Sequence, residues 1–173
     1  MRNEHGVQSI DVQVDRTEQV EPSGTAVGLD IGLKEFYTDS NGEMVENPRF
    51  IRKGEQVLKR SQRRVSRKVK GSGNRREARL ILGKRHLKIS RQRKDHAVKL
   101  ARCVITSNDV VAYEDLRIKN MVKNHCLAKS INGASWHQFR VWIEYFGKVF
   151  GRVTIAVNPQ YTICKACSMQ TTR

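Results

Sequence analysis

The chain has 173 residues, 38% of them hydrophobic, and its 33 Lys and Arg residues exceed its 17 Asp and Glu residues, for a net charge of +16. This length and apolar content suffice for one domain with its own core, and they exclude a disordered tail. The cationic excess predicts a polyanionic partner, because clustered cations release counterions from a phosphate backbone when they bind it. The alternative is a basic surface without a partner, which would destabilise the compact state by self-repulsion.

The sequence does not predict a membrane-bound or secreted protein. No segment reaches the roughly 18 apolar residues that a membrane-spanning helix requires. The first residues, Met1–Gly6, lack the apolar core of a secretory signal. We therefore expect a cytoplasmic protein without membrane contact, in which the four cysteines are reduced; the sequence does not indicate an oligomeric state. In a reducing compartment a close pair of cysteines indicates metal or redox chemistry more than a disulfide.

Three antiparallel strands are predicted at the start of the domain. The run Val27–Leu33 (Val-Gly-Leu-Asp-Ile-Gly-Leu) is typical of a buried strand and contains Asp30. Strands are predicted at 36–40 and 43–46, and Asn41-Gly42 between them is a strong hairpin signal.

A long basic helical hairpin is predicted to follow. Residues 55–70 and 75–106 are predicted to be helical, the second because its apolar side chains recur at helical spacings with cations between them, and Gly71–Asn74 is the predicted turn. From Ile51 to Arg102 the chain has 20 Lys and Arg residues but three acids. Such a local concentration of cations predicts a surface that faces a nucleic acid.

The remaining elements alternate between strand and helix. Val110–Tyr113 is predicted to be a buried strand, with Glu114 and Asp115 at its C-terminal end. Residues 115–133 lack a firm period and are predicted to form a short helix and a loop. An amphipathic helix is predicted from Trp136 to Phe150 with Ser135 as its N-cap, and a buried strand at 153–157.

Two carboxylates stand where apolar strands are expected. A buried ionised carboxylate destabilises a fold by several kcal/mol unless another group compensates it. If strands 27–33 and 110–114 are neighbours, Asp30 and Glu114 point into the same space, and a divalent cation such as Mg²⁺ or Mn²⁺ would relieve their repulsion. Such a metal beside a basic groove indicates phosphodiester hydrolysis. The alternatives are a turn or cap role for Asp30 and an ion pair for Glu114.

A second candidate metal site lies near the end of the sequence. Cys164 and Cys167 have the Cys-x-x-Cys spacing of a zinc knuckle, which supplies two of the four ligands that tetrahedral zinc requires. Nothing in the spacing favours His125 and Cys126 as the missing pair. The alternative is two reduced surface thiols.

Taken in order, these segments resemble the TnpB (OrfB) proteins of insertion sequences. The resemblance rests on Val27–Lys34, on the basic segments 58–68 and 92–96, on 111–125 and 130–136, and on the Pro-x-Tyr-Thr and Cys-x-x-Cys ending. It implies a transposon-encoded, RNA-guided DNA endonuclease. The fold implied is α/β, with an RNase H-like (RuvC-like) mixed sheet, a long basic helical hairpin inserted into it, and half of a zinc ribbon.

The resemblance also implies a role for individual residues. Asp30 and Glu114 would be the catalytic acids and Mg²⁺ (or Mn²⁺) ligands, with Asp115 a non-ligand neighbour, while Cys164 and Cys167 would form the first zinc knuckle. The basic helices would hold the guide RNA and the target DNA by backbone contacts. The candidate contacts are Arg60, Arg63, Arg64, Arg67, Lys68, Arg75, Arg76, Arg79, Arg91, Arg93 and Lys94.

The sequence departs from the family pattern at both ends. No segment matches the third catalytic Asp or the second zinc knuckle, and residues 1–25 are expected to be the remnant of a larger N-terminal region. The expected division is a RuvC-like core at 26–157 with a helical insertion at 52–107, followed by an incomplete zinc ribbon at 158–173. We therefore expect a fragment with weak or no cleavage activity. The alternatives are a catalytically inactive nucleic-acid-binding remnant or repressor and a basic ribosome-associated protein.

Overall fold

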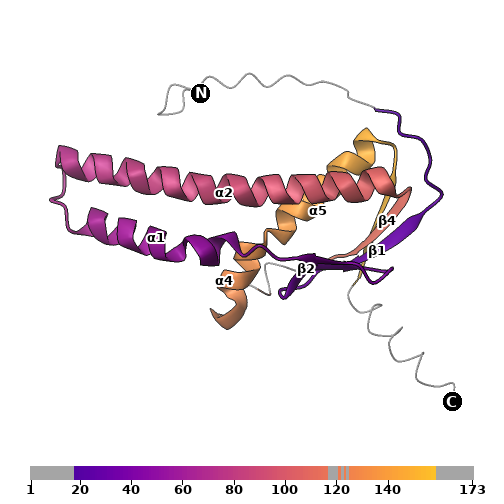
Figure 1. Ribbon diagram of the computed structural model, residues 1–173, viewed down its shortest axis with the longest axis horizontal. Helices are drawn as coiled ribbons and strands as arrows, with labels where there is room; N and C mark the ends of the chain where they lie inside the picture. The colour runs from indigo at the N-terminus through magenta and orange to yellow at the C-terminus, as the bar shows by residue number, and fades with distance from the viewer. Residues whose placement is uncertain (1–17, 117–120, 122, 124, 159–173) are drawn as a thin grey trace, which may run out of the picture.

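The computed structural model describes residues 18–116, 121, 123 and 125–158. Along these residues strands come first, followed by a pair of helices, a strand, further helices and a last strand, as Figure 1 shows. They are β1 (Ala26–Asp30), β2 (Glu35–Asp39), β3 (Met44–Glu46), α1 (Phe50–Ser66), α2 (Gly73–Ser107), β4 (Val110–Glu114), α4 (His125–Ala134), α5 (Trp136–Val149) and β5 (Val153–Val157).

The strands form one mixed sheet in the order β3-β2-β1-β4-β5. The β1–β2 and β2–β3 pairs are antiparallel, whereas β1 and β5 both pair with β4 in parallel. The β2–β3 connection forms the predicted hairpin, since Gly42 takes a φ of 87° that favours glycine. The expected α/β class with a mixed sheet is confirmed.

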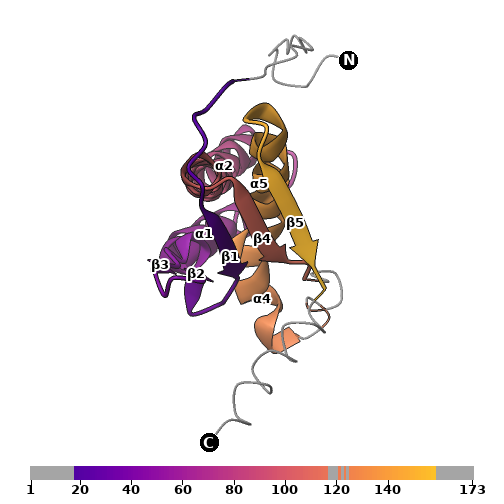
Figure 2. The same ribbon diagram turned by 90° about the vertical axis from the view of Figure 1, so that its right-hand side faces the viewer.

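Helices α2 and α5 cover one face of the sheet. Alternate residues of the central strands, such as Leu29 and Val111, are buried against this layer together with Ile105 and Phe139. Alternate side chains of a strand point to opposite faces, so one apolar register is enough to build this core. Figure 2 views β1, β4 and β5 in front, with the two helices behind them.

The opposite face of the central strands is open in the described part of the chain. Val153 and Ile155 are 54% and 47% exposed, and the strand register places them beside Val110 and Ala112 of β4. The prediction that β5 is buried was therefore wrong for this face. An apolar run identifies a strand, but it does not reveal whether a layer covers each side.

Helices α1 and α2 form the hairpin between β3 and β4. The Ser72 side chain caps α2 by accepting a 3.2 Å hydrogen bond from the Arg75 N–H. Arg85 of α2 donates to the Ser61 side chain and to the Val57 carbonyl of α1, which joins the two helices. At 35 residues α2 is about 52 Å long, so the hairpin extends well beyond the sheet, as Figure 1 shows.

Several predicted boundaries were displaced. The first helix begins at Phe50 and ends at Ser66, against the predicted 55–70, and the second spans 73–107. Strand β1 ends at Asp30 because the next residues turn toward β2, where the Gly32 N–H bonds the Phe36 carbonyl at 3.4 Å. Asp30 is therefore an exposed strand-end residue, and the expectation of a buried carboxylate inside a strand was wrong.

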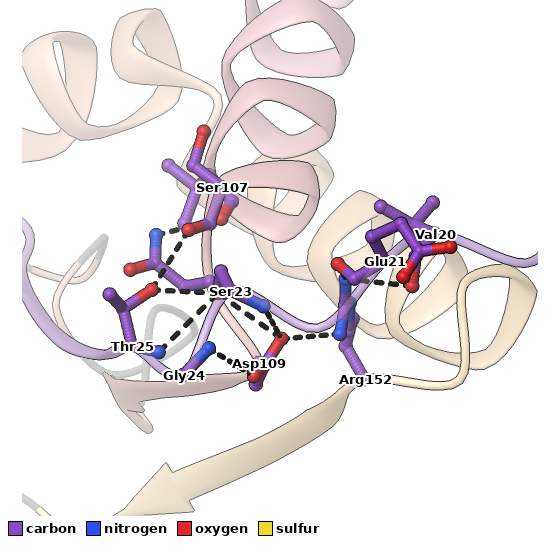
Figure 3. A network of polar contacts seen from close by, with 10 residues as sticks. Val20, Glu21, Ser23, Gly24, Thr25, Ser107, Asp109 and Arg152 are labelled. Atoms are coloured by element: carbon purple, nitrogen blue, oxygen red, sulfur yellow. Dashed lines mark hydrogen bonds and ion pairs between the residues drawn. The ribbon is translucent and has the colours of Figure 1, made fainter.

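Residues 20–25 are held at the end of the sheet where β1, β4 and β5 begin, by a polar network centred on Asp109 (Figure 3). The Asp109 carboxylate accepts hydrogen bonds from the N–H groups of Ser23 at 2.9 Å and Gly24 at 2.7 Å. Arg152, whose side chain is 6% exposed, forms an ion pair with Asp109 and donates to the Val20 and Glu21 carbonyls. The segment before β1 is thus joined to the residues that precede β4 and β5.

Among the described helices, none combines the length and the apolar character needed to cross a membrane.

Candidate acidic site and basic surface

Asp30 and Glu114 lie side by side at the C-terminal ends of β1 and β4. These strands run parallel with Leu29 opposite Tyr113, so the next residue of each strand is its neighbour on the open face. Both side chains line an open cavity of about 580 Å³ together with Thr38 and Ala112. The structure thus brings together the two acids that the sequence singled out.

The two carboxylates interact electrostatically. Partial burial raises the pKa of the Glu114 carboxyl above its ordinary value, and the negative charge of Asp30 raises it further. Two like charges at one site favour proton uptake or the binding of a cation. Their hard oxygen atoms suit Mg²⁺ or Mn²⁺, so the donor set fits such a metal. Two carboxylates supply only part of the coordination shell of such a cation, and the described residues contain no cluster of three or more potential ligands.

The residues on either side of Glu114 are fixed by helix α5. The Tyr113 hydroxyl donates to Glu144 Oε1 at 2.8 Å, and Arg140 pairs with both Glu144, at 3.3 Å, and Asp115. Burial raises the pKa of Tyr113, as does its hydrogen bond to Glu144. Asp115 is thus committed to an ion pair. Sequence reasoning missed Arg140 and Glu144; their helical i, i+4 spacing was the available signal, but it does not identify a partner on β4.

Five basic residues from the C-terminal part of α1 and the turn after it line one surface hollow. Arg60, Arg63, Arg64, Arg67 and Lys68 line it together, since residues three and four apart share one side of a helix. Within the described residues none of these five forms an ion pair. Their charges are available to an external polyanion.

The predicted contacts on α2 fall into two groups. Arg76, Arg79 and Arg91 are exposed. The other three have intramolecular contacts: Arg75 donates to the Lys68 carbonyl at 3.1 Å, Arg93 donates to the Ser135 hydroxyl at 2.7 Å, and the Lys94 ammonium lies 5.5 Å from the Trp142 ring centre.

Ser135 precedes α5, as predicted, but its side chain does not cap the helix. Its hydroxyl receives the Arg93 hydrogen bond, and burial lowers the pKa of the Arg93 guanidinium. The predicted N-cap was therefore wrong in its chemistry although its position was right. Arg93 ties the hairpin to α5.

The predicted zinc ligands Cys164 and Cys167 lie outside the described residues. Cys126 is a residue of α4. Cys103 is a free, exposed cysteine on α2. The structure therefore does not test the zinc prediction.

Comparison with known proteins gives consistent matches. A family model, OrfB_IS605, described as "Probable transposase", matches residues 9–125. A "Putative RNA-guided DNA endonuclease" of Streptomyces pristinaespiralis is 37% identical over 142 residues, which cover 82% of this chain and 35% of that protein. The "Putative RNA-guided DNA endonuclease InsQ" of Escherichia coli K12 is 30% identical over 169 residues, covering 89% of this chain and 42% of that protein. The chain thus spans about two fifths or less of the length of these relatives.

Proposed function

Because this chain belongs to the TnpB (OrfB) transposase family, we propose that it forms part of a metal-dependent, RNA-guided DNA endonuclease. The observation that carries the proposal is the pairing of Asp30 and Glu114 on neighbouring parallel strands, in one cavity of a strongly basic chain. Guide RNA and target DNA are the proposed partners. Cleavage is proposed for a protein of the full length of these relatives, because this chain matches only part of that length.

The proposed architecture is an RNase H-like (RuvC-like) core at 26–157 with the basic hairpin inserted at 52–107. Support comes from the strand order, in which the antiparallel β1–β2–β3 unit is extended by parallel strands β4 and β5. Further support comes from the positions of Asp30 and Glu114, which are the last residues of β1 and of the neighbouring strand β4. Residues 158–173 are proposed to contribute half of a zinc ribbon through Cys164 and Cys167.

In the proposed reaction, Asp30 and Glu114 would hold a divalent cation, Mg²⁺ or Mn²⁺. When bound, such a cation supplies a reactive water and stabilises the leaving oxygen of a phosphodiester. The contacts of Tyr113 and Asp115 with α5 orient the end of β4, so that Glu114 faces the open side of the sheet. Because two carboxylates hold a divalent cation less firmly than three, we expect this chain by itself to cleave only weakly.

The hairpin is proposed to bind the RNA–DNA duplex through its phosphates. Its cations lie on the outside of two long helices, and α2 continues from the hairpin into the sheet layer. Such a surface recognises backbone charge and shape rather than base identity. The same surface would serve the alternative function, a catalytically inactive nucleic-acid-binding protein or repressor.

Cleavage of labelled single-stranded DNA with Mn²⁺ or Mg²⁺ tests the proposal. The unchanged chain should cleave slowly, and Asp30→Ala should reduce the rate by more than the roughly 10–100-fold that removal of an outer-shell partner causes. The control Glu77→Gln removes an exposed acid of α2 and should leave the rate unchanged. Equal rates for the unchanged chain and Asp30→Ala would refute the nuclease assignment. DNA binding without cleavage would favour the non-catalytic alternative.

A further inference from the structure

A second cavity, of about 440 Å³, lies between the β1–β2 loop, the start of α1 and the end of α4. We call it the α1–α4 cavity. Its charged rim contains Lys34, Arg49 and Arg52, and its apolar lining includes Leu33 and Ile51. Leu33 is three residues after Asp30, at most about 10 Å along an extended chain, so the β1–β2 loop connects the cavity to the acidic site.

Asn47 builds the rim of this cavity. Its side chain is buried, donating to the Leu33 carbonyl at 3.2 Å and accepting from the Arg49 N–H at 3.1 Å. These bonds connect the β1–β2 loop to the residues before α1. They also support Arg49 in the left-handed region, at φ 48° and ψ 44°, which is unfavourable for a residue with a Cβ.

The charge of the rim is positive and largely uncompensated. Helix α1 has no acidic residue in its first turn and no side-chain cap. Within the described residues neither Arg49 nor Arg52 forms an ion pair. The Lys34 Nζ atom lies 3.8 Å from Glu35 Oε1, but the Lys34 side chain is 90% exposed, so this contact is weak. Glu55, the acid that lines the cavity, forms an ion pair with Lys59 at 2.7 Å.

The far side of the cavity is apolar because α4 presents small residues there. Gly133 and Ala134 line it, and a Cβ added to Gly133 would meet Ile51 only at 3.9 Å. The missing side chain thus leaves room beside Leu33 and Ile51. A volume of this size is typical of a small-molecule site with an apolar lining and a few placed polar groups.

We propose that the α1–α4 cavity binds one unpaired nucleotide of the DNA strand that enters the acidic site. The phosphate would lie against Arg49, Arg52 and Lys34, because guanidinium groups pair with phosphate oxygens. The base would lie against Leu33, Ile51 and the gap at Gly133. The role in cleavage rests on the proposed nuclease function, whereas nucleotide binding itself does not require Asp30 or Glu114.

Titration of the isotope-labelled full chain with 2′-deoxythymidine 5′-monophosphate, followed by methyl NMR, tests this site. The Leu33, Ile51 and Ala134 methyl signals should shift and saturate, whereas those of the exposed Leu80 and Leu87 on α2 should not. Arg49→Gln with Arg52→Gln should weaken binding at least tenfold. Gly133→Leu should abolish it by filling the cavity. The control Lys99→Gln with Lys148→Gln, at exposed positions of α2 and α5, should leave it unchanged.

Other outcomes would overturn the site. Equal affinity for inorganic phosphate would reduce it to an anion site, and equal affinity for thymidine would remove the role of the cations. Unchanged binding by a folded Gly133→Leu chain, or by the Arg49/Arg52 double variant, would place the nucleotide elsewhere. Binding that persists in Asp30→Ala while cleavage is absent in the unchanged chain would support the cavity and refute the nuclease function, so the two failures are distinguishable.

Discussion

At the residue scale, Glu114 is oriented by what its neighbours contact. Tyr113 donates to Glu144 and Asp115 pairs with Arg140, so both flanking residues are fixed to α5. Because successive side chains of a strand alternate between faces, anchoring Tyr113 on the helix side directs Glu114 to the open side, beside Asp30. The position of one candidate catalytic group therefore depends on a helix that is distant from it in the chain.

Tyr113→Phe removes the hydroxyl that reaches Glu144 and should lower the free energy of unfolding by about 1 kcal/mol, as expected for a partly exposed hydrogen bond. Urea denaturation measures this change. The matched control Tyr145→Phe, on the exposed side of α5, should be neutral. Equal stabilities of the two variants would show that the Tyr113–Glu144 bond does not stabilise the fold.

His96 links the hairpin to the core and is sensitive to pH. Its ring packs edge-on against Phe36 at 5.0 Å and Phe50 at 5.8 Å, and burial lowers its pKa, an effect that the charge of Asp95 partly opposes. Between the lowered folded pKa and the ordinary value near 6.5, the unfolded chain binds more protons than the folded chain. Stability should therefore fall as the pH drops below about 6.5.

The urea midpoint measured between pH 7.5 and pH 5 should decrease with pH in the unchanged chain, and His96→Gln should flatten that decrease. His86→Gln, at an exposed position of α2, serves as the control and should retain the slope. A slope that His96→Gln leaves unaltered would mean that other groups determine the pH response.

At the element scale, α2 belongs to two structures at once. Its C-terminal half packs Ala97, Ala101 and Ile105 into the core, and its N-terminal half packs against α1 through Ala78 and Arg85. Because α2 is one continuous helix of 35 residues, it fixes the position of the basic surface relative to the core. The cationic hollow on α1 is thereby held at a defined place relative to the acidic site.

Arg60→Gln, Arg63→Gln and Arg64→Gln together should weaken binding of single-stranded DNA and reduce its salt dependence. The slope of log K against log salt concentration should become less negative by about 0.7 for each phosphate that no longer meets a cation. Fluorescence anisotropy at several salt concentrations measures the slope. Lys99→Gln, whose ammonium is paired with Asp95 at 2.8 Å, should have little effect; an equally weakened control would indicate nonspecific attraction to the net charge.

At the scale of the whole molecule, Asp109 and Arg152 join segments that are distant in sequence. They connect residues 20–25 to the starts of β4 and β5 (Figure 3). Because β1, β4 and β5 run parallel, this is the end of the sheet opposite to Asp30 and Glu114. The hydrogen bonds from Ser23 and Gly24 and the charge of Arg152 hold the pKa of the Asp109 carboxyl below its usual value. This stabilisation is complete above the unfolded pKa, near 4, and is lost as the pH falls through the folded pKa.

Asp109→Asn should therefore destabilise the protein at pH 7 and reduce the loss of stability between pH 5 and pH 3, which thermal unfolding at several pH values measures. Asp95→Asn, which alters an exposed helical ion pair, should have a smaller effect at pH 7. If Asp95→Asn proved as destabilising as Asp109→Asn, the network would contribute nothing beyond a surface charge.

Local patterns alone determined much of this protein. Short apolar runs predicted the strands and helical spacing predicted the hairpin, because both depend on the geometry of neighbouring residues. Asn41-Gly42 predicted a turn for the same reason, and parallel strands place Asp30 beside Glu114 once β1 and β4 are neighbours. The tertiary structure decided what a periodic pattern does not encode, which is the partner of each polar group. Segments distant in sequence meet in the contacts of Arg93 with Ser135 and of Arg140 with Asp115. The open face of β5 and the α1–α4 cavity likewise depend on how distant segments pack.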